Sequence, residues 1–262
     1  MRPNTLLRRC ADATTYMFVM ALAGLSLHAR AAELPRTVAA IKPSVVGVGT
    51  YLKTRSPAIV FSGTGFVVDD GLSVITNAHV VPAILDSEKR EELGVVIARG
   101  SEIEFRAASV AGIDKIHDLA HLRLTGAPLP AMKLGQNGDA AEGMDLAFTG
   151  FPLGMVLGLH HATHRATLAA ITPIVMPSLS SRTLDARMIA QLQRGPLQIY
   201  QLDGTAYPGN SGSPVYDPAT GNVVAVINMT LVKGLKETAI TSPSGISYAI
   251  PVEYVRDLLQ RK

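Results

Sequence analysis

Short apolar, β-branched runs dominate the chain after about Pro35, and Gly, Pro or Asp interrupt them every few residues. Runs of this length between turn residues are typical of strands in a sandwich or barrel. A first set covers residues 45–48, 65–68, 74–76, 95–98 and 120–124. A second set covers residues 145–149, 166–171, 198–202, 223–227 and 246–250. The pattern predicts an all-β fold.

Two β lobes and one terminal helix are expected from the spacing of these runs. A Pro- and Gly-rich passage, residues 127–138, separates the two sets and is typical of a linker. Asp70 and Gly71 lie between two runs of the first set, and they indicate a hairpin turn with positive φ at both central residues. After the second set, apolar residues recur at helical spacing and predict an amphipathic helix at about 252–261.

The first 31 residues have the order of an export signal. Arg2, Arg8 and Arg9 precede an apolar run at 16–27, and a small-x-small cleavage pattern ends at Ala31. We predict cleavage there, which leaves a domain at 32–262 that is periplasmic or secreted and has no stable membrane insertion. An uncleaved anchor is the alternative, although the run is shorter than the ~20 residues that span a bilayer.

Charge and cysteine content bear on which partners and which chemistry the mature domain can have. The chain has 24 basic and 21 acidic residues, and removing residues 1–31 leaves 20 of each. A neutral domain gives no reason to expect nucleic acid as a partner. The only cysteine, Cys10, lies in the predicted signal, so neither a disulfide nor thiol chemistry is expected in the domain.

The most specific chemical motif is a serine between glycines, in the sequence PGNSGSP at 208–214. A tight turn of this kind lets the Ser211 hydroxyl protrude while backbone N–H groups converge beside it. A tetrahedral oxyanion is stabilised by donors placed where its charge develops, and the amides of Gly209 and Ser211 are the candidates. A Gly/Ser loop without a chemical role is the alternative for this motif taken alone.

Two further residues would complete a nucleophilic site. His79 follows the predicted hairpin, and a serine hydroxyl needs an adjacent base whose pKa lies near neutrality. Asp118 precedes a strand whose alternation places its carboxylate on the apolar face, where a charge requires a partner. Accepting the N–H of His79 would supply that partner and fix the tautomer. A structural histidine and an aspartate bonded to nearby amides are the alternatives, and Asp114 is a weaker candidate for the acid.

The order His79, Asp118, Ser211 resembles that of the trypsin-like serine proteases, and within them the bacterial high-temperature-requirement (HtrA-like) proteases. The similarity extends over about 40–259 and includes the segments 150–154, 201–203 and 245–251. The resemblance implies two perpendicular six-stranded antiparallel β-barrels of the chymotrypsin type, at about 36–126 and 139–250, with the active site in the cleft between them and a short C-terminal helix.

The resemblance also implies the chemistry. Ser211 would attack a peptide carbonyl to form an acyl-enzyme, His79 would serve as general base, and Asp118 would orient His79. Polypeptides are the expected substrates, and the mechanism requires neither a metal nor an organic cofactor. A homo-oligomer is suggested by family analogy alone. We expect no peptide-binding PDZ domain after residue 262.

Substrate-contacting residues follow from the same resemblance. Thr205, six residues before the serine, would lie at the base of the primary specificity pocket and favour small or medium uncharged side chains. Ile227, Asn228 and Met229 would pair with an extended substrate backbone. Ser213 stands where a second glycine commonly follows the nucleophile.

Three other interpretations are less well supported by the sequence. Ester hydrolysis uses the same triad, but the chain lacks a Gly-x-Ser-x-Gly elbow between strand and helix. A non-catalytic peptide-binding or chaperone-like module on the same fold is the alternative of another class. His160, His161 and His164 suggest a metal site, but no cysteine or carboxylate lies near them in the sequence, so we expect a structural or solvated cluster.

Overall fold

The computed structural model describes residues 33–99, 102–154, 158–174, 197–229 and 245–261. The predicted export signal at 1–31 and its cleavage site lie outside these residues and stay a prediction. None of the described helices is long and apolar enough to cross a lipid bilayer.

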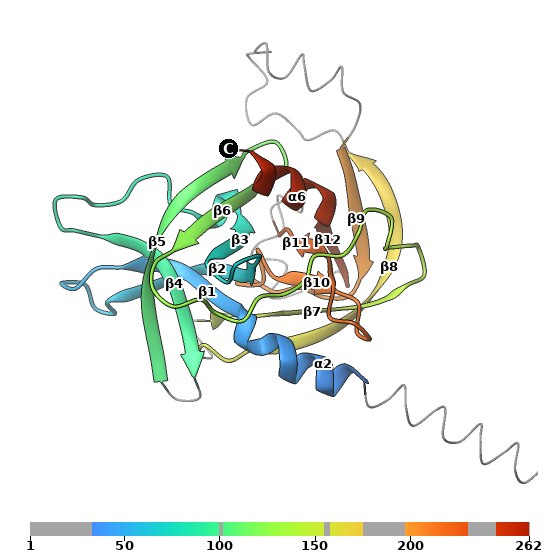
Figure 1. The fold of residues 1–262 in the computed structure, drawn as a ribbon, viewed down its shortest axis with the longest axis horizontal. Coiled ribbons are helices and arrows are strands. Elements are labelled where there is room, and N and C mark those ends of the chain that lie inside the picture. Colours follow the sequence, from blue (N-terminus) through green and yellow to red (C-terminus); the bar gives the residue numbers. More distant parts are fainter. Residues whose placement is uncertain (1–32, 100–101, 155–157, 175–196, 230–244, 262) are drawn as a thin grey trace, which may run out of the picture.

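The strands close into two six-stranded antiparallel barrels, as predicted (Figure 1). The first barrel has the order β1-β2-β3-β6-β5-β4. Its strands are β1 (Val45–Tyr51), β2 (Ile59–Val68), β3 (Ser73–Asn77), β4 (Glu92–Arg99), β5 (Glu102–Asp114) and β6 (Leu119–Leu124). The second barrel has the order β10-β11-β12-β9-β8-β7. Its strands are β7 (Asp145–Gly150), β8 (Ala162–Ile174), β9 (Leu197–Asp203), β10 (Pro214–Tyr216), β11 (Val223–Ile227) and β12 (Ile246–Pro251).

Strands β5 and β10 are the two that the sequence pattern does not predict. Most residues of β5 are at least partly exposed, without the regular in-out alternation that marks a half-buried strand. Strand β10 has only three residues and begins at a proline. Tertiary pairing therefore defines both strands: β5 pairs with β4 and β6, and β10 pairs with β7 and β11.

The predicted hairpin between β2 and β3 forms, but its turn differs from the expected one. Positive φ values occur at Asp69 and Gly71, and not at Asp70. The Asp70 carboxylate instead accepts a hydrogen bond from the Leu72 amide at 3.1 Å. The connection between the strands is therefore longer than a two-residue turn.

A helix at the start of the described chain, α2 (Glu33–Ile41), is a further departure from the predicted strands. Ile41 is buried, and Leu34 packs against the same core cluster. The spacing of these two residues, i and i+7, is helical, but the segment is too short to reveal a period on its own. A Cβ on Gly221, in the turn between β10 and β11, would lie 3.3 Å from the methyl groups of Thr37 and Ile41, so α2 packs on the second barrel.

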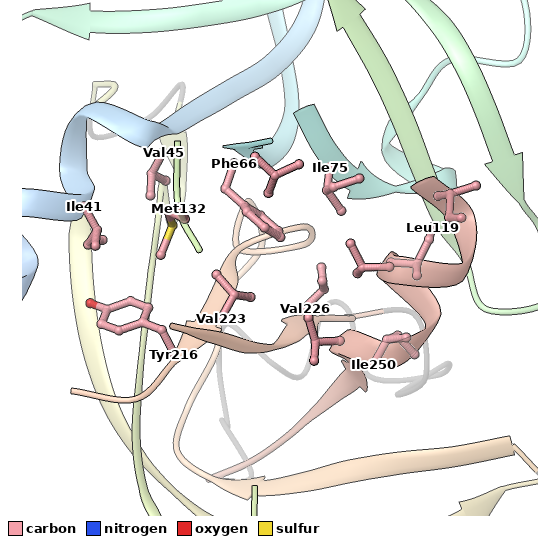
Figure 2. Packing of buried hydrophobic residues seen from close by; sticks show 14 of the residues in the cluster. Ile41, Val45, Phe66, Ile75, Leu119, Met132, Tyr216, Val223, Val226 and Ile250 are labelled. Atoms are coloured by element: carbon pink, nitrogen blue, oxygen red, sulfur yellow. The ribbon is translucent and has the colours of Figure 1, made fainter. Parts of the chain in front are cut away.

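One hydrophobic cluster joins the barrels (Figure 2). Phe66, Ile75 and Leu119 extend into it from strands β2, β3 and β6 of the first barrel. The second barrel contributes residues of β9 to β12, among them Val226 and Ile250. The cluster fixes the two barrels against each other, so side chains at their junction keep a defined spacing.

The C-terminal helix α6 (Val252–Gln260) packs into this cluster through Val252, Val255 and Leu258, which confirms the predicted apolar face. It contacts β5 and β6 of the first barrel and β11 and β12 of the second. Figure 1 shows the same arrangement, with α6 lying between β6 and β12. The helix therefore braces the junction of the barrels.

Truncating Ile41 to alanine is expected to lower the free energy of unfolding by about 2–4 kcal/mol, because the cavity left at a buried branched side chain adds to the lost transfer energy. Arg36→Ala, on the exposed face of the same helix, is expected to change stability by no more than about 0.5 kcal/mol. Urea unfolding of both variants compares them. Equal midpoints would show that α2 does not contribute to the core.

Candidate active site

His79 lies on a short 3-10 turn (η2, Ala78–Val80) that directly follows β3. The flanking residues Asn77 and Val80 are buried, whereas the His79 side chain is 27% exposed. The end of β3 thus fixes the backbone while the ring reaches the surface of the junction. This is the position that the sequence predicts for the candidate base.

Asp118 lies in the turn before β6 and not within the strand, so the alternation from which its inward direction was predicted does not apply to it. Its φ is +52°, a left-handed conformation that non-glycine residues seldom adopt, although aspartate tolerates it. The backbone bend, together with its hydrogen bonds, turns the carboxylate inward. The predicted orientation is therefore reached for a different physical reason.

The Asp118 carboxylate holds His79 by two hydrogen bonds. His79 Nδ1 lies 2.6 Å from Asp118 Oδ2, and the His79 amide donates to Oδ1 at 2.9 Å. Burial raises the pKa of Asp118, but the hydrogen bond and charge of the His79 ring, the His79 amide and Asn228 outweigh it and hold the pKa below 3.8. The carboxylate is therefore ionised at neutral pH and can accept the Nδ1 proton.

Asn228 is a member of this group that sequence reasoning assigns elsewhere. It follows β11 of the second barrel, and its Nδ2 donates to Asp118 Oδ2 at 2.8 Å. Asn228 is buried, so this hydrogen bond crosses the junction between the barrels in a water-poor environment. The family resemblance predicts instead that Asn228 pairs with a substrate backbone. No sequence pattern could reveal its contact with Asp118, because the two residues are 110 positions apart.

The backbone of Asp118 is tied to the end of β3 as well. Its carbonyl accepts hydrogen bonds from the Ala78 amide and from Asn77 Nδ2, both at 3.0 Å. The Asn77 side chain thereby bridges the strand that precedes His79 and the turn that carries Asp118. Main-chain and side-chain contacts together fix the relative position of the base and its carboxylate.

The Ser211 loop is attached to β2 of the first barrel. The Thr64 amide donates to the Ser211 carbonyl at 2.8 Å, and the Thr64 hydroxyl donates to the Gly209 carbonyl at 2.7 Å. Gly212 has φ +86°, and a Cβ there would overlap the Thr64 carbonyl, so only glycine fits. The serine of the second barrel is in this way held against a strand of the first.

Gly63 separates the serine loop from the residue that follows His79. A Cβ on Gly63 would lie 2.7 Å from Val80 Cγ2 and 3.0 Å from the Ser211 carbonyl oxygen. The two loops therefore approach each other across a glycine. Among the described residues, the Ser211 hydroxyl and His79 Nε2 do not form a hydrogen bond with each other, so the structure pairs His79 with Asp118 but leaves the third contact open.

The Gly209 amide has its direction fixed by a neighbouring peptide group. Leu153, in the loop after β7, donates its amide to the Pro208 carbonyl at 2.7 Å. Because C=O and N–H of a trans peptide point in opposite directions, the Gly209 N–H points away from Leu153. Within the described chain, neither this amide nor that of Ser211 has a hydrogen-bond acceptor, so both donors remain available.

Ser213 is accommodated in the motif because residue 150 is glycine. A Cβ on Gly150 would overlap the Ser213 hydroxyl and would lie 2.8 Å from Asn210 Oδ1. Ser213 and Asn210 are fully buried. The Ser213 hydroxyl, which a second glycine would lack, thus lies beside Gly150 beneath the loop. It does not reach the candidate oxyanion donors.

The residues predicted to contact substrate fall into two groups. Thr205 lies just after β9, beside a loop that Ser247 holds by accepting the Ala206 amide at 2.9 Å and donating to the Gly204 carbonyl at 2.6 Å. Ile227 already has both backbone groups bonded within the chain, to Ser213 and Gly212. The backbone of Ile227 is therefore not free to pair with a substrate. Met229, which is half-buried, lies at the end of the predicted substrate strand.

Asp114, the weaker candidate for the acid, is bonded to other groups. His117 Nδ1 lies 2.7 Å from its Oδ2, and Arg261 Nη2 lies 2.8 Å from the same oxygen. Burial raises the pKa of Asp114, but the side chain and amide of His117 and the charges of His117 and Arg261 lower it to about 2. Asp114 is thus not available to His79.

The three histidines near the start of β8 have separate environments. His161 Nε2 bonds to the Val45 carbonyl at 2.9 Å, and its ring lies against Phe151. His164 is stacked on Phe148 with ring centroids 4.9 Å apart, whereas His160 is exposed. Burial lowers the pKa of both His161 and His164. No group of three metal-ligating side chains occurs among the residues that the structure describes.

Residues 63–226 match the trypsin-like peptidase domain family, and the chain belongs to this family. Serine protease HTRA2, mitochondrial, from Drosophila pseudoobscura pseudoobscura is 29% identical over 205 residues, which are 78% of this chain and 40% of the fly protein. Human serine protease HTRA4 is 28% identical over 84% of this chain and 39% of its own length. A probable periplasmic serine endoprotease DegP-like from Halomonas elongata is 28% identical over 75% of this chain and 34% of its length.

Solved structures agree with the two-barrel fold. The active form of the Rv3671c protease from M. tuberculosis superposes with a TM-score of 0.62 at 22% identity, covering 85% of this chain and 82% of that one. The HtrA-type protease AlgW with a decapeptide gives a TM-score of 0.62 at 20% identity, covering 87% of this chain and 66% of that one. These structures confirm the predicted two-barrel fold, and the family match together with the HtrA relatives confirms the predicted trypsin-like, HtrA-like relationship. The chain spans less than half the length of the curated relatives named above.

Replacing Asp114 with asparagine is expected to lower the free energy of unfolding at pH 7 by about 2 kcal/mol, because a pKa shifted from 3.8 to about 2 stabilises the folded state by that order. A depressed pKa stabilises above the ordinary pKa, and the contribution is lost as pH falls from about 4 towards 2. The difference between variant and parent should therefore shrink over that range. Urea titrations at pH 7, 5, 4 and 3 measure it, with the exposed Asp145→Asn as control. A difference independent of pH would contradict the assignment.

Proposed function

We propose that the chain is a serine endopeptidase that cleaves extended or unfolded polypeptides through an acyl-enzyme on Ser211. The observation that carries the proposal is the pairing of His79 with Asp118 beside a serine loop attached to the same barrel. With Nδ1 bonded to the carboxylate, His79 presents Nε2 as the atom that takes the Ser211 proton. The imidazolium that forms is stabilised by the ionised Asp118, and it then protonates the leaving amine.

The open contact between Ser211 and His79 is compatible with this mechanism. Hydrogen bonds between nucleophile and base are often long without substrate and tighten in the Michaelis complex. The Gly209 and Ser211 amides are the proposed donors to the oxyanion. The bond from Leu153 to Pro208 supports this role, since it orients the Gly209 N–H before substrate arrives and so avoids reorganisation during the reaction.

A polypeptide substrate is supported by the family and by the relatives' names, which describe serine proteases. We propose Thr205 as the base of the primary specificity pocket, where the absence of a carboxylate at that residue gives no attraction for lysine or arginine. Met229 and Asn228 are proposed to border the bound backbone. A homo-oligomer and export through residues 1–31 belong to the same proposal, and the periplasmic DegP-like relative is consistent with export.

Ser211→Ala in the full chain is the decisive variant. Cleavage of unfolded casein is expected for the parent and is expected to fall by at least about 10³-fold in the variant, since the remaining groups supply only a residual part of catalysis. A serine-directed phosphonate is expected to label the parent alone, and mass spectrometry locates the adduct. If the parent neither cleaves casein nor reacts with the phosphonate while binding casein, the chain is a non-catalytic peptide-binding module and the proposal fails.

Asn228→Ala is expected to lower kcat about tenfold or more with little change in KM. A hydrogen bond to a charged group contributes about 1.5–3 kcal/mol, and here it stabilises the carboxylate that supports the imidazolium. Steady-state cleavage of a labelled peptide measures both constants. Asn222→Ala, in the turn before β11, is the matched control and should leave kcat unchanged. An effect on KM alone would instead assign Asn228 to substrate binding.

A further inference from the structure

A second aspartate–histidine pair joins the end of β5 to the turn that leads into Asp118. His117 Nδ1 lies 2.7 Å from Asp114 Oδ2, while the amides of Ile116 and His117 donate to Asp114 Oδ1 at 3.0 and 3.1 Å. Asp114 is 3% exposed. A single buried carboxylate thus binds the side chain and the backbone of the residue immediately before Asp118.

Helix α6 covers this pair from the outside. The ring of Tyr254 is stacked on His117 with centroids 4.0 Å apart and an angle of 18° between the planes. Arg261, just after the helix, adds the contact to Asp114 Oδ2 at 2.8 Å. The Tyr254 hydroxyl accepts a hydrogen bond from the Gln198 amide of β9 at 3.3 Å. The helix therefore links the turn of the first barrel to a strand of the second.

The backbone of Asp118 needs such support. Its φ of +52° is a sparsely populated conformation, and conformations of this kind persist where the surroundings over-determine them. On the C-terminal side, Ala78 and Asn77 hold the Asp118 carbonyl. On the N-terminal side, the groups that hold the chain are those of the Asp114–His117 pair. The backbone on both sides of Asp118 is therefore held by hydrogen bonds.

We infer that His117 is a positioning residue for the active site: its ring, held between the Asp114 carboxylate and Tyr254, fixes the turn that directs Asp118 towards His79. The inference rests on the proposed function, because the consequence of positioning is read in catalysis. It makes α6 part of the active-site support, so a change at Tyr254 reaches Asp118 through His117.

A double-mutant cycle in the full chain tests the coupling. His117→Ala and Tyr254→Ala are each expected to lower kcat about tenfold or more with KM unchanged, because a displacement of ~1 Å away from the chemistry costs up to about 10²-fold. Since both act through one contact, the double variant is expected to be no slower than the slower single variant. If the loss of kcat in the double variant equals the product of the two single losses, the proposal is overturned. Circular dichroism at the assay temperature ensures that every variant compared is folded.

Conservative variants separate the two interactions of the ring. His117→Asn retains a donor near the Nδ1 position but loses the stack, and His117→Phe retains the stack but not the donor. Each is expected to recover part of the kcat lost in His117→Ala. Lys115→Ala, exposed in the same turn, is the control that should keep the parent's kcat. If His117→Ala lowers stability but keeps kcat within twofold of the parent, His117 has a structural role only and the inference is wrong.

A measurement made without substrate distinguishes failure of the His117 inference from failure of the endopeptidase proposal. The proton in the 2.6 Å contact of His79 with Asp118 is expected to give a low-field proton NMR signal, assigned by its loss in His79→Ala. In His117→Ala the signal should broaden or move, whether or not the parent cleaves casein. An unchanged signal would overturn the positioning role, whereas a changed signal in an inactive parent would leave it intact and reject only the endopeptidase proposal.

Discussion

The buried carboxylate of Asp118 is the group on which the organisation of the site depends. A charge at the junction of two barrels is costly unless hydrogen bonds compensate it. His79 supplies two of these bonds from the first barrel, and Asn228 supplies one from the second. The stabilisation of this single charge therefore requires both barrels in their observed arrangement, and it also sets the tautomer of the histidine that we propose as the base.

Close approach of the loops depends on small residues at the junction. Thr64 of β2 carries the serine loop, and it can do so because Gly63 and Gly212 leave its backbone accessible. The apolar cluster beneath then fixes the distance between the barrels without adding polar groups that would need partners. The geometry of the site thus depends both on the apolar cluster that fixes the barrels and on the hydrogen bonds that attach the serine loop to β2.

Much of the fold was predictable from the sequence because most strands are short apolar runs, largely buried on both faces and bounded by turn residues. The serine motif and the order of His79 and Asp118 indicated the chemistry. Strand β5 was not predictable, since most of it is exposed and its place follows from pairing. The contact of Asn228 with Asp118 joins residues 110 positions apart, and a local pattern cannot encode it. Nor does alternation explain Asp118, whose orientation follows from its positive φ.

Two aspartates, Asp114 at the end of β5 and Asp118 in the turn before β6, are each paired with a histidine. Their surroundings differ. Asp114 is shared with the cationic Arg261, and Tyr254 covers the ring of His117, whose side chain is 16% exposed. Asp118 instead receives the neutral carboxamide of Asn228, and the His79 side chain is 27% exposed. Because Arg261 contacts the same Asp114 oxygen as His117, its guanidinium would repel a second positive charge formed there. The Asp118 pair, whose partner from the second barrel is neutral, is the one suited to stabilise an imidazolium formed at the mouth of the junction.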